Sequence, residues 1–171
     1  MVMLPRMQNH CKAGANLNNR SMPDTSNSAL PAVGLLERLT PEQRDRLQTF
    51  GEVFSLKKGD HLIEQGQPQG YMHVVLKGEL KVHVASKEAV VPLGYVEAGG
   101  CVGEMSLLEP SIASASVTAS APSEVWSLTR ERFDAFVADH PAPAAELLRG
   151  IALTLADRLR KGSERLLASE T

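Results

Sequence analysis

Cysteine is scarce in this sequence, with only Cys11 and Cys101 among 171 residues. Such a pair gives neither a disulfide framework nor a paired metal-binding motif, so we expect a reducing, cytoplasmic location. Long apolar runs are missing too, since none approaches the roughly 18–20 residues of a membrane span. Basic residues near the N-terminus are not followed by an apolar segment, so no signal peptide is predicted.

An excess of positive charge is also lacking. The chain has 18 Lys and Arg against 20 Asp and Glu, a formal net charge of −2. This balance leaves no basic field to attract nucleic acid or an anionic membrane surface. Apolar residues make up 43% of the chain and charged residues 22%, close to the averages of globular proteins. The length predicts one domain with a sizeable core.

The first 30 residues lack any hydrophobic period. They are rich in Asn, Ser, Met and Pro, a composition typical of disordered segments. We therefore predict a disordered tail at 1–30 and a single domain at 31–171. A solvated leader and a partner-binding peptide are both open as roles for the tail.

The domain begins with helical signals and continues with strands. Thr40 suits an N-cap, Pro41 the first helical position, and Gln43 completes a capping box. From Gly51 onward, short segments rich in β-branched residues alternate with glycine-containing turns at intervals of about ten residues, which predicts a closed or rolled antiparallel sheet. The predicted strands are 53–54, 61–63, 72–76, 80–84, 90–96, 117–119 and 124–128.

Two helices are predicted after the strands. Residues 130–138 form a short amphipathic pattern carrying Phe133 and Phe136. Residues 144–168 form the strongest helical pattern of the chain, with one broad apolar stripe. The stripe contains Leu147, Leu148, Ile151, Ala152, Leu155, Leu159 and Leu166. Since the sequence leaves no room for a helix-turn-helix after this segment, we expect no direct contact with nucleic acid.

Several motifs in this order resemble the cyclic nucleotide-binding domain of the catabolite-activator type. They lie at residues 39–43, 58–60, 64–66, 76–82 and 99–108, and the resemblance covers about residues 33–160. It implies a mainly β fold with flanking helices. That fold is an antiparallel β-roll of the double-stranded β-helix or jelly-roll type, with an N-terminal helix, a short cassette helix and C-terminal helices.

The resemblance is strongest in the phosphate-binding cassette, here residues 99–117. Gly103 permits a close approach of the backbone to a ligand, and the helical turn after it, with Met105 and Ser106, points backbone N–H groups toward an anion. By resemblance, Glu104 holds the ribose 2′-hydroxyl of a cyclic nucleotide. The alternative is that Glu104 is a structural carboxylate at a helix start.

The sequence departs from the family pattern in the second half of the cassette. The family reads Pro-Arg-[Ser/Thr/Ala]-Ala-[Thr/Ser]-Val and its arginine forks onto the cyclic phosphate. The matching residues here are Ile112, Ala113, Ser114, Ala115, Ser116 and Val117. No Arg or Lys occurs from residue 88 to residue 126. Losing a bidentate phosphate contact costs about 1.5–3 kcal/mol, or about 10- to 150-fold in affinity.

Three functions remain open for a regulatory domain of this kind. In the first, the cassette binds cAMP or cGMP with help from a cation elsewhere in the chain. In the second, the cassette is retuned to another small ligand. In the third, the domain has lost ligand binding, and the fold serves as a scaffold or dimerisation module. By resemblance, the long C-terminal helix closes over the base, forms a homodimer and passes a signal to an effector protein.

Signals for catalysis and for metal binding are lacking. No nucleophile elbow, P-loop or dinucleotide-binding glycine motif is present, so we expect no enzyme. His73 and His83 are isolated on strands and are not expected to bind a metal. Cys101 is expected to be a small, half-buried side chain near the ligand, with a redox or haem-ligand role as the alternative.

Overall fold

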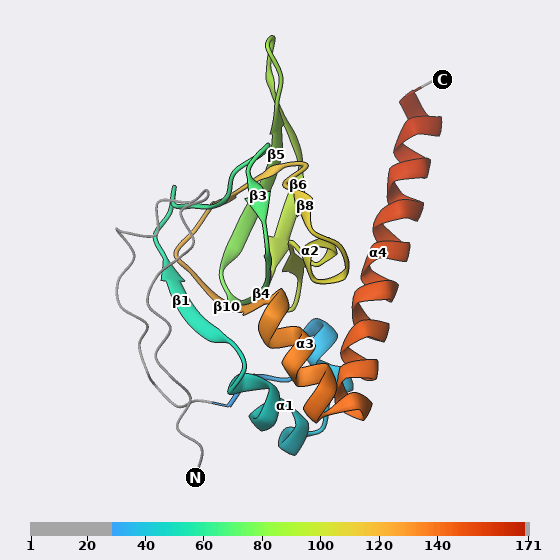
Figure 1. The fold of residues 1–171 in the computed structure, drawn as a ribbon. Helices are drawn as coiled ribbons and strands as arrows, with labels where there is room; N and C mark the ends of the chain where they lie inside the picture. The colour runs from blue at the N-terminus through green and yellow to red at the C-terminus, as the bar shows by residue number, and fades with distance from the viewer. Residues whose placement is uncertain (1–28, 170–171) are drawn as a thin grey trace.

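The structure is a computed structural model that describes residues 29–169 (Figure 1). The predicted tail, 1–30, therefore lies almost entirely outside the described residues. Its last residue, Leu30, is 2% exposed and packs in the core. The Leu30 N–H donates to Gln48 Oε1, and its carbonyl accepts from Arg44 Nε. The described chain is thus already packed one residue before the predicted start of the domain.

The strands form an antiparallel roll, as predicted. One sheet has the order β1-β10-β4-β7, a second has the order β2-β9-β5-β6, and β3 pairs with β8. Their bounds are β1 Glu52–Leu56, β2 His61–Ile63, β3 Pro68–Gln69, β4 Tyr71–Lys77, β5 Glu79–Ala85, β6 Val90–Glu97, β7 Cys101–Val102, β8 Ser111–Ile112, β9 Ser116–Ala119 and β10 Ser123–Thr129.

All seven predicted strands are present, most of them longer by one to three residues than predicted. Strands β3, β7 and β8 were not predicted, because two residues are too few to show an alternating pattern. Strand β3 begins at Pro68, which the sequence pattern assigned to a turn. Tertiary pairing of Pro68 with Ile112 and of Gln69 with Ser111 makes it a strand.

The hairpin of β5 and β6 projects beyond the rest of the roll (Figure 1). Apolar and polar residues alternate over residues 80–84, which predicts one buried and one solvent-exposed face. This prediction holds only at the base of the hairpin. Leu80 is buried, whereas the residues after it are half-buried on both faces. Toward the tip no second layer covers either face, and Val90 is 60% exposed.

The N-terminal helical elements form as the sequence predicts. A 3-10 helix, η2, spans Gly34–Arg38, and α1 spans Pro41–Gln48. The predicted capping box is confirmed, because Gln43 N–H donates to Thr40 Oγ1 and Thr40 N–H donates to Gln43 Oε1. This cap satisfies two backbone donors at the start of α1.

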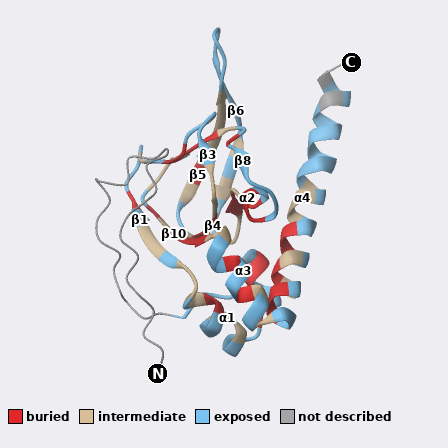
Figure 2. Cartoon of the chain, viewed as in Figure 1, coloured by how far each residue is buried: buried red, intermediate tan, exposed pale blue. Residues whose placement is uncertain are grey.

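Two helices follow the strands. Helix α3 spans Arg130–Asp139 and α4 spans Pro141–Ser169, three residues earlier than predicted because proline is tolerated at the first helical position. The apolar stripe of α4 divides along the helix. Leu147 and Ile151 are buried, but Leu159 is 73% exposed, and Figure 2 shows buried residues only in the first half of α4. The side chain of Leu166 lies outside the described residues. No described helix combines the length and apolar content needed to cross a membrane.

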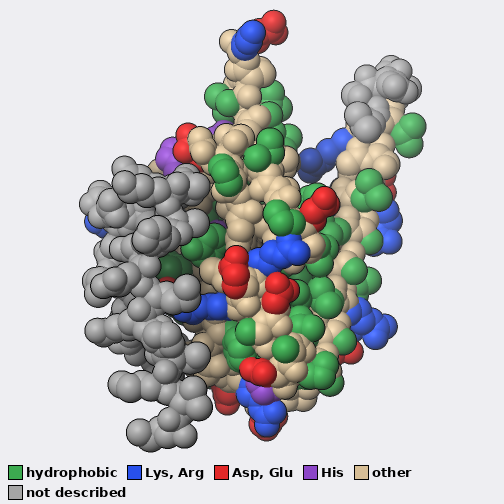
Figure 3. All heavy atoms as spheres, in the orientation of Figure 1, with side chains coloured by type: hydrophobic (Ala, Val, Ile, Leu, Met, Phe, Trp, Pro, Cys, Tyr) green, Lys and Arg blue, Asp and Glu red, His purple; other side chains and the backbone are tan. Residues whose placement is uncertain are grey.

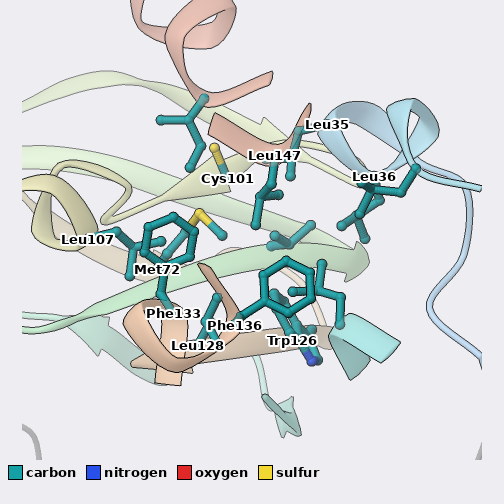
Figure 4. Packing of buried hydrophobic residues seen from close by; sticks show 14 of the residues in the cluster. Leu35, Leu36, Met72, Cys101, Leu107, Trp126, Leu128, Phe133, Phe136 and Leu147 are labelled. Carbon is teal, nitrogen blue, oxygen red and sulfur yellow. The ribbon is translucent and has the colours of Figure 1, made fainter. Parts of the chain in front are cut away.

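Two apolar clusters make up the core. The first joins the helices to the sheet, and Figure 4 shows ten of its members labelled: Leu35, Leu36, Met72, Cys101, Leu107, Trp126, Leu128, Phe133, Phe136 and Leu147. The second cluster fills the roll. It consists of Leu56, Leu62, Ile63, Val75, Leu80, Val102, Ala113, Val117, Ala119 and Val125. The cassette contributes residues to both clusters.

A backbone contact joins η2 to the turn before β7. Gly34 has φ +53°, and a Cβ added to it would lie 1.7 Å from the carbonyl oxygen of Gly99. No side chain fits at that distance, so Gly34 allows the N-terminal segment to pack directly on the start of the cassette.

This contact predicts unequal effects of alanine at two glycines with positive φ. Gly59→Ala adds a Cβ that meets nothing within 4 Å, so it should lower the free energy of unfolding by only about 1 kcal/mol. Gly34→Ala adds the same backbone strain and also a clash with the Gly99 carbonyl, so it should lower the free energy of unfolding by more than about 3 kcal/mol. Urea denaturation of both variants tests this, and equal losses would contradict the packing described.

Candidate ligand-binding site

The first half of the cassette turns tightly against strand β4. Gly103 follows β7 with φ +73°, and a Cβ there would lie 2.3 Å from the Tyr71 carbonyl oxygen and 2.9 Å from Gln69 Nε2. Helix α2 (Met105–Leu108) starts directly after Glu104. Only glycine fits this combination of backbone angle and close approach, so Gly103 fixes where Glu104 sits.

Glu104 is buried at 4% exposure, although it is a carboxylate. It occupies the N-cap position of α2, but its side chain makes no capping hydrogen bond. Glu104 therefore does not cap the helix through its side chain, and the alternative of a structural carboxylate at a helix start stays open. A buried carboxylate needs another partner to offset its desolvation.

Arg158 of α4 provides that partner. Its Nη1 donates to Glu104 Oε1 at 2.5 Å, and its Nη2 donates to the Cys101 carbonyl. One guanidinium thus joins α4 to both sides of the Gly103 turn. One of the three functions open from the sequence requires a cation from elsewhere in the chain, and Arg158 was not singled out for it. Its spacing after Ile151 and Leu155, at i+7 and i+3, places it on the roll-facing side of the helix and was the available signal.

The second carboxylate oxygen of Glu104 is unsatisfied. Glu104 Oε2 is buried and has no hydrogen-bond partner among the described residues. Buried polar atoms are normally paired, because leaving one unpaired costs about 1–3 kcal/mol. This oxygen therefore lacks the donor that a buried carboxylate oxygen normally has.

Ala113 lies against the interior of the roll. It is 9% exposed and belongs to the apolar cluster there. Its N–H donates to the Gln67 carbonyl and its carbonyl accepts from Gly66 N–H, each at 2.8 Å. The position of the family's arginine is thus occupied by an apolar wall. The side chains of Met105 and Ile112 do not fill the space that the family's arginine would occupy, since they are 59% and 68% exposed.

The remaining predicted residues separate into buried and exposed ones. Ser106 and Ser116 are buried, and the Ser116 hydroxyl accepts from Gln65 N–H at 3.0 Å. Ala115 is half-buried, whereas Met105 and Ser114 are exposed. Four of the predicted residues, Glu104, Ser106, Ala113 and Ser116, are thus buried.

The backbone donors expected to face an anion are largely engaged. Ser106 N–H donates to the Gly103 carbonyl at 3.0 Å, and Leu107 N–H donates to the Glu104 carbonyl at 3.2 Å. Helix α2 has four residues, so its dipole is small. The expectation of several free N–H groups after Gly103 is therefore met only in part.

Cys101 is fully buried rather than half-buried as predicted. Burial raises the pKa of Cys101 to about 12, and the nearby Glu104 carboxylate adds to the shift. The thiol therefore stays protonated at neutral pH, which does not suit a thiolate ligand or nucleophile. His73 Nδ1 lies 2.6 Å from Ser127 Oγ in the sheet. No cluster suited to a metal ion occurs in the part of the chain that the structure describes.

A surface groove of about 540 Å³ lies between η2 and α4. Its lining residues are Gly34, Leu35, Glu37, Arg38, Gly99, Gly150, Leu153 and Thr154. Glu104 is not among them, so the groove is separate from the carboxylate site.

Comparison with known families agrees with this geometry. A model of the cyclic nucleotide-binding domain matches residues 53–140. The chain belongs to the cyclic nucleotide-binding domain family. The matched range includes Gly103, Glu104 and Ala113. This domain is not itself catalytic.

Similar proteins carry the domain within much longer chains. Glutaminase 1 of Bradyrhizobium diazoefficiens is 30% identical over 125 residues, 73% of this chain and 20% of that protein. The cGMP-dependent protein kinase egl-4 of Caenorhabditis elegans is 33% identical over 98 residues, 57% of this chain and 12% of the kinase. This chain thus spans a fifth or less of these relatives.

Solved structures show the same fold. A cyclic nucleotide-binding domain from Methylobacillus flagellatus kt is 25% identical, with a TM-score of 0.72 over 77% of this chain and 74% of that one. The predicted β-roll with flanking helices is thereby confirmed at the level of the family.

The pairing of Glu104 with Arg158 predicts a measurable stability effect. Arg158→Ala should lower the free energy of unfolding by about 1–3 kcal/mol, because it leaves a buried carboxylate uncompensated while 40% exposure of the Arg158 side chain moderates the loss. Lys161→Ala is the matched control, since its pair with Asp157 is exposed and should contribute much less to the free energy of unfolding.

A double variant separates the ion pair from general effects of the substitution. Adding Glu104→Gln to Arg158→Ala removes the orphaned charge, so the combined loss should be smaller than the sum of the two single losses. Additive losses in chemical denaturation would show that the two side chains do not act as a pair.

Proposed function

We propose that this chain is a regulatory domain that senses a small ligand at its cassette and passes the signal through α4. The ligand is a cyclic nucleotide bound weakly, or a related small molecule. The observation that carries the proposal is the buried Glu104 carboxylate, held at the Gly103 turn with Oε2 unpartnered. An acceptor of this kind is stabilised by a ligand hydroxyl.

The route to the output is the contact between the cassette and α4. Arg158 binds Glu104 and the Cys101 carbonyl, so a ligand that engages Glu104 changes the balance of contacts holding the helix. Farther along α4, Arg165 Nη1 donates to the Leu93 carbonyl of β6 at 2.9 Å. Differential contacts of this sort are what a ligand needs to shift a helix between two positions.

The relatives support a regulatory role with a varied output. One is named as a glutaminase and another as a cGMP-dependent protein kinase, so similar domains accompany different activities. For the present chain we propose an effector protein as the recipient of the signal. The kinase's name makes cGMP a sensible first ligand to test, together with cAMP.

Ala113 explains why cyclic nucleotide binding should be weak. The arginine that would fork onto the phosphate is replaced by a small apolar side chain at 9% exposure. Ala113→Arg should therefore raise the affinity for cAMP or cGMP about 10- to 150-fold, because it adds one bidentate contact to phosphate. Calorimetric titration of both proteins measures the change.

A second variant links the gain to the same bound pose. Glu104→Gln in the Ala113→Arg background should remove much of the gain, since the hydroxyl and phosphate contacts act on one ligand. Loss of stability in Ala113→Arg with no gain in affinity would mean that the wall at position 113 does not accept a cation.

A second candidate function is a scaffold that dimerises through α4. Its outward face carries exposed small and apolar residues at spacings of three and four, namely Ala152, Ala156, Leu159, Ser163 and Leu167. Figure 3 shows several hydrophobic side chains on the described part of this helix, with charged side chains between them. Leu159 and Leu167 are 73% and 70% exposed, which suits contact with a second copy of the chain.

Leu159→Asp tests this candidate without disturbing the monomer, because the side chain is exposed in the single chain. If α4 forms a homodimer, the variant should sediment as a monomer while the wild type sediments as a dimer at tens of micromolar. Lys161→Asp is the control on the opposite side of α4, where the side chain is also exposed. A wild type that stays monomeric at hundreds of micromolar rules the dimer out.

A further inference from the structure

The cassette supplies no cation of its own to an anionic ligand. Residues 88–126 contain no Lys or Arg. Among the described residues, the guanidinium that contacts the cassette is that of Arg158, and both of its terminal nitrogens already donate to the cassette. Since Arg158 and Glu104 neutralise each other, the site carries no net positive charge.

Arg158 is not free to change partners at low cost. Moving its guanidinium from Glu104 to a phosphate would leave a carboxylate at 5% side-chain exposure without a counter-charge. A buried, uncompensated charge is strongly unfavourable. A negatively charged ligand would lie beside that same carboxylate and add repulsion.

The other elements that bind a phosphate are weak here as well. Ala113 presents a methyl group, and its backbone N–H is already bonded to the Gln67 carbonyl. The N–H groups of Ser106 and Leu107 donate to carbonyls of the Gly103 turn. What the site offers instead is an acceptor, Glu104 Oε2, which is buried and unpaired.

From this combination we infer that the cassette binds a neutral ligand with a ribose-like hydroxyl pair, a nucleoside in preference to its cyclic phosphate. The inference rests on the proposed function, because it assumes a ligand at Glu104. A hydroxyl donates to Oε2 without bringing in a charge, and the ion pair of Glu104 with Arg158 stays intact.

Calorimetric titration of the full chain tests the inference with three pairs of probes. Adenosine and guanosine are compared with cAMP and cGMP, and with their 2′-deoxy forms. At least one nucleoside should bind at least about 10-fold more tightly than its own cyclic phosphate. The 2′-deoxy form of that nucleoside should bind at least about 10-fold more weakly than the nucleoside itself. Glu104→Gln should cause a similar loss of affinity, whereas Glu88→Gln, the same change at an exposed residue outside the cassette, should cause none.

The outcomes separate the inference from the proposed function. Tighter binding of a cyclic nucleotide than of either nucleoside overturns the inference and leaves ligand sensing in place. Nucleoside binding that Glu104→Gln does not change also overturns it, because the ligand would then sit elsewhere. A probe concentration of about 1 mM detects a binding free energy of about 4 kcal/mol. If none of the probes binds at this concentration, both the inference and the sensing function are wrong.

Discussion

Cys101 and Val102 lie side by side on strand β7 but belong to different cores. Cys101 is fully buried in the cluster that joins helices and sheet, and Val102 packs into the cluster inside the roll. Because successive strand residues face opposite sides, two residues suffice to tie the two clusters together. The tight turn at Gly103 follows at once. The position of Glu104 therefore depends on the packing of both cores, and this packing holds the candidate site in place.

The ion pair between Glu104 and Arg158 extends this coupling to the last helix. Beyond Leu155 most of α4 is exposed, and the polar contacts of Arg158 and Arg165 hold it to the cassette and to β6. This second half of α4 is held by two arginines rather than by an apolar face, so it can change position without unpacking the core. The same ion pair neutralises the site. One contact thus bears both on the proposed signal route and on the charge of a suitable ligand.

Much of the fold was accessible from local patterns. The capping box at Thr40 and Gln43 depends on four consecutive residues, and the seven longer strands on alternation and glycine turns, so both were predicted. The strands β3, β7 and β8 were not, because two residues are too few to show an alternating pattern. Likewise, residues 80–84 alternate regularly, but the layer that would bury one face ends before the hairpin does.

The sequence alone determined the residues of the cassette, including a glutamate after Gly103 and an alanine in place of the arginine. Only the tertiary structure decided what these residues face. It brought Arg158 across 54 residues to Glu104, left one carboxylate oxygen without a donor, and placed Ala113 in an apolar cluster. The tertiary structure also showed which part of the apolar stripe of α4 is buried. The reason is that burial and ion pairing depend on segments distant along the chain, whereas residue type and spacing are local properties.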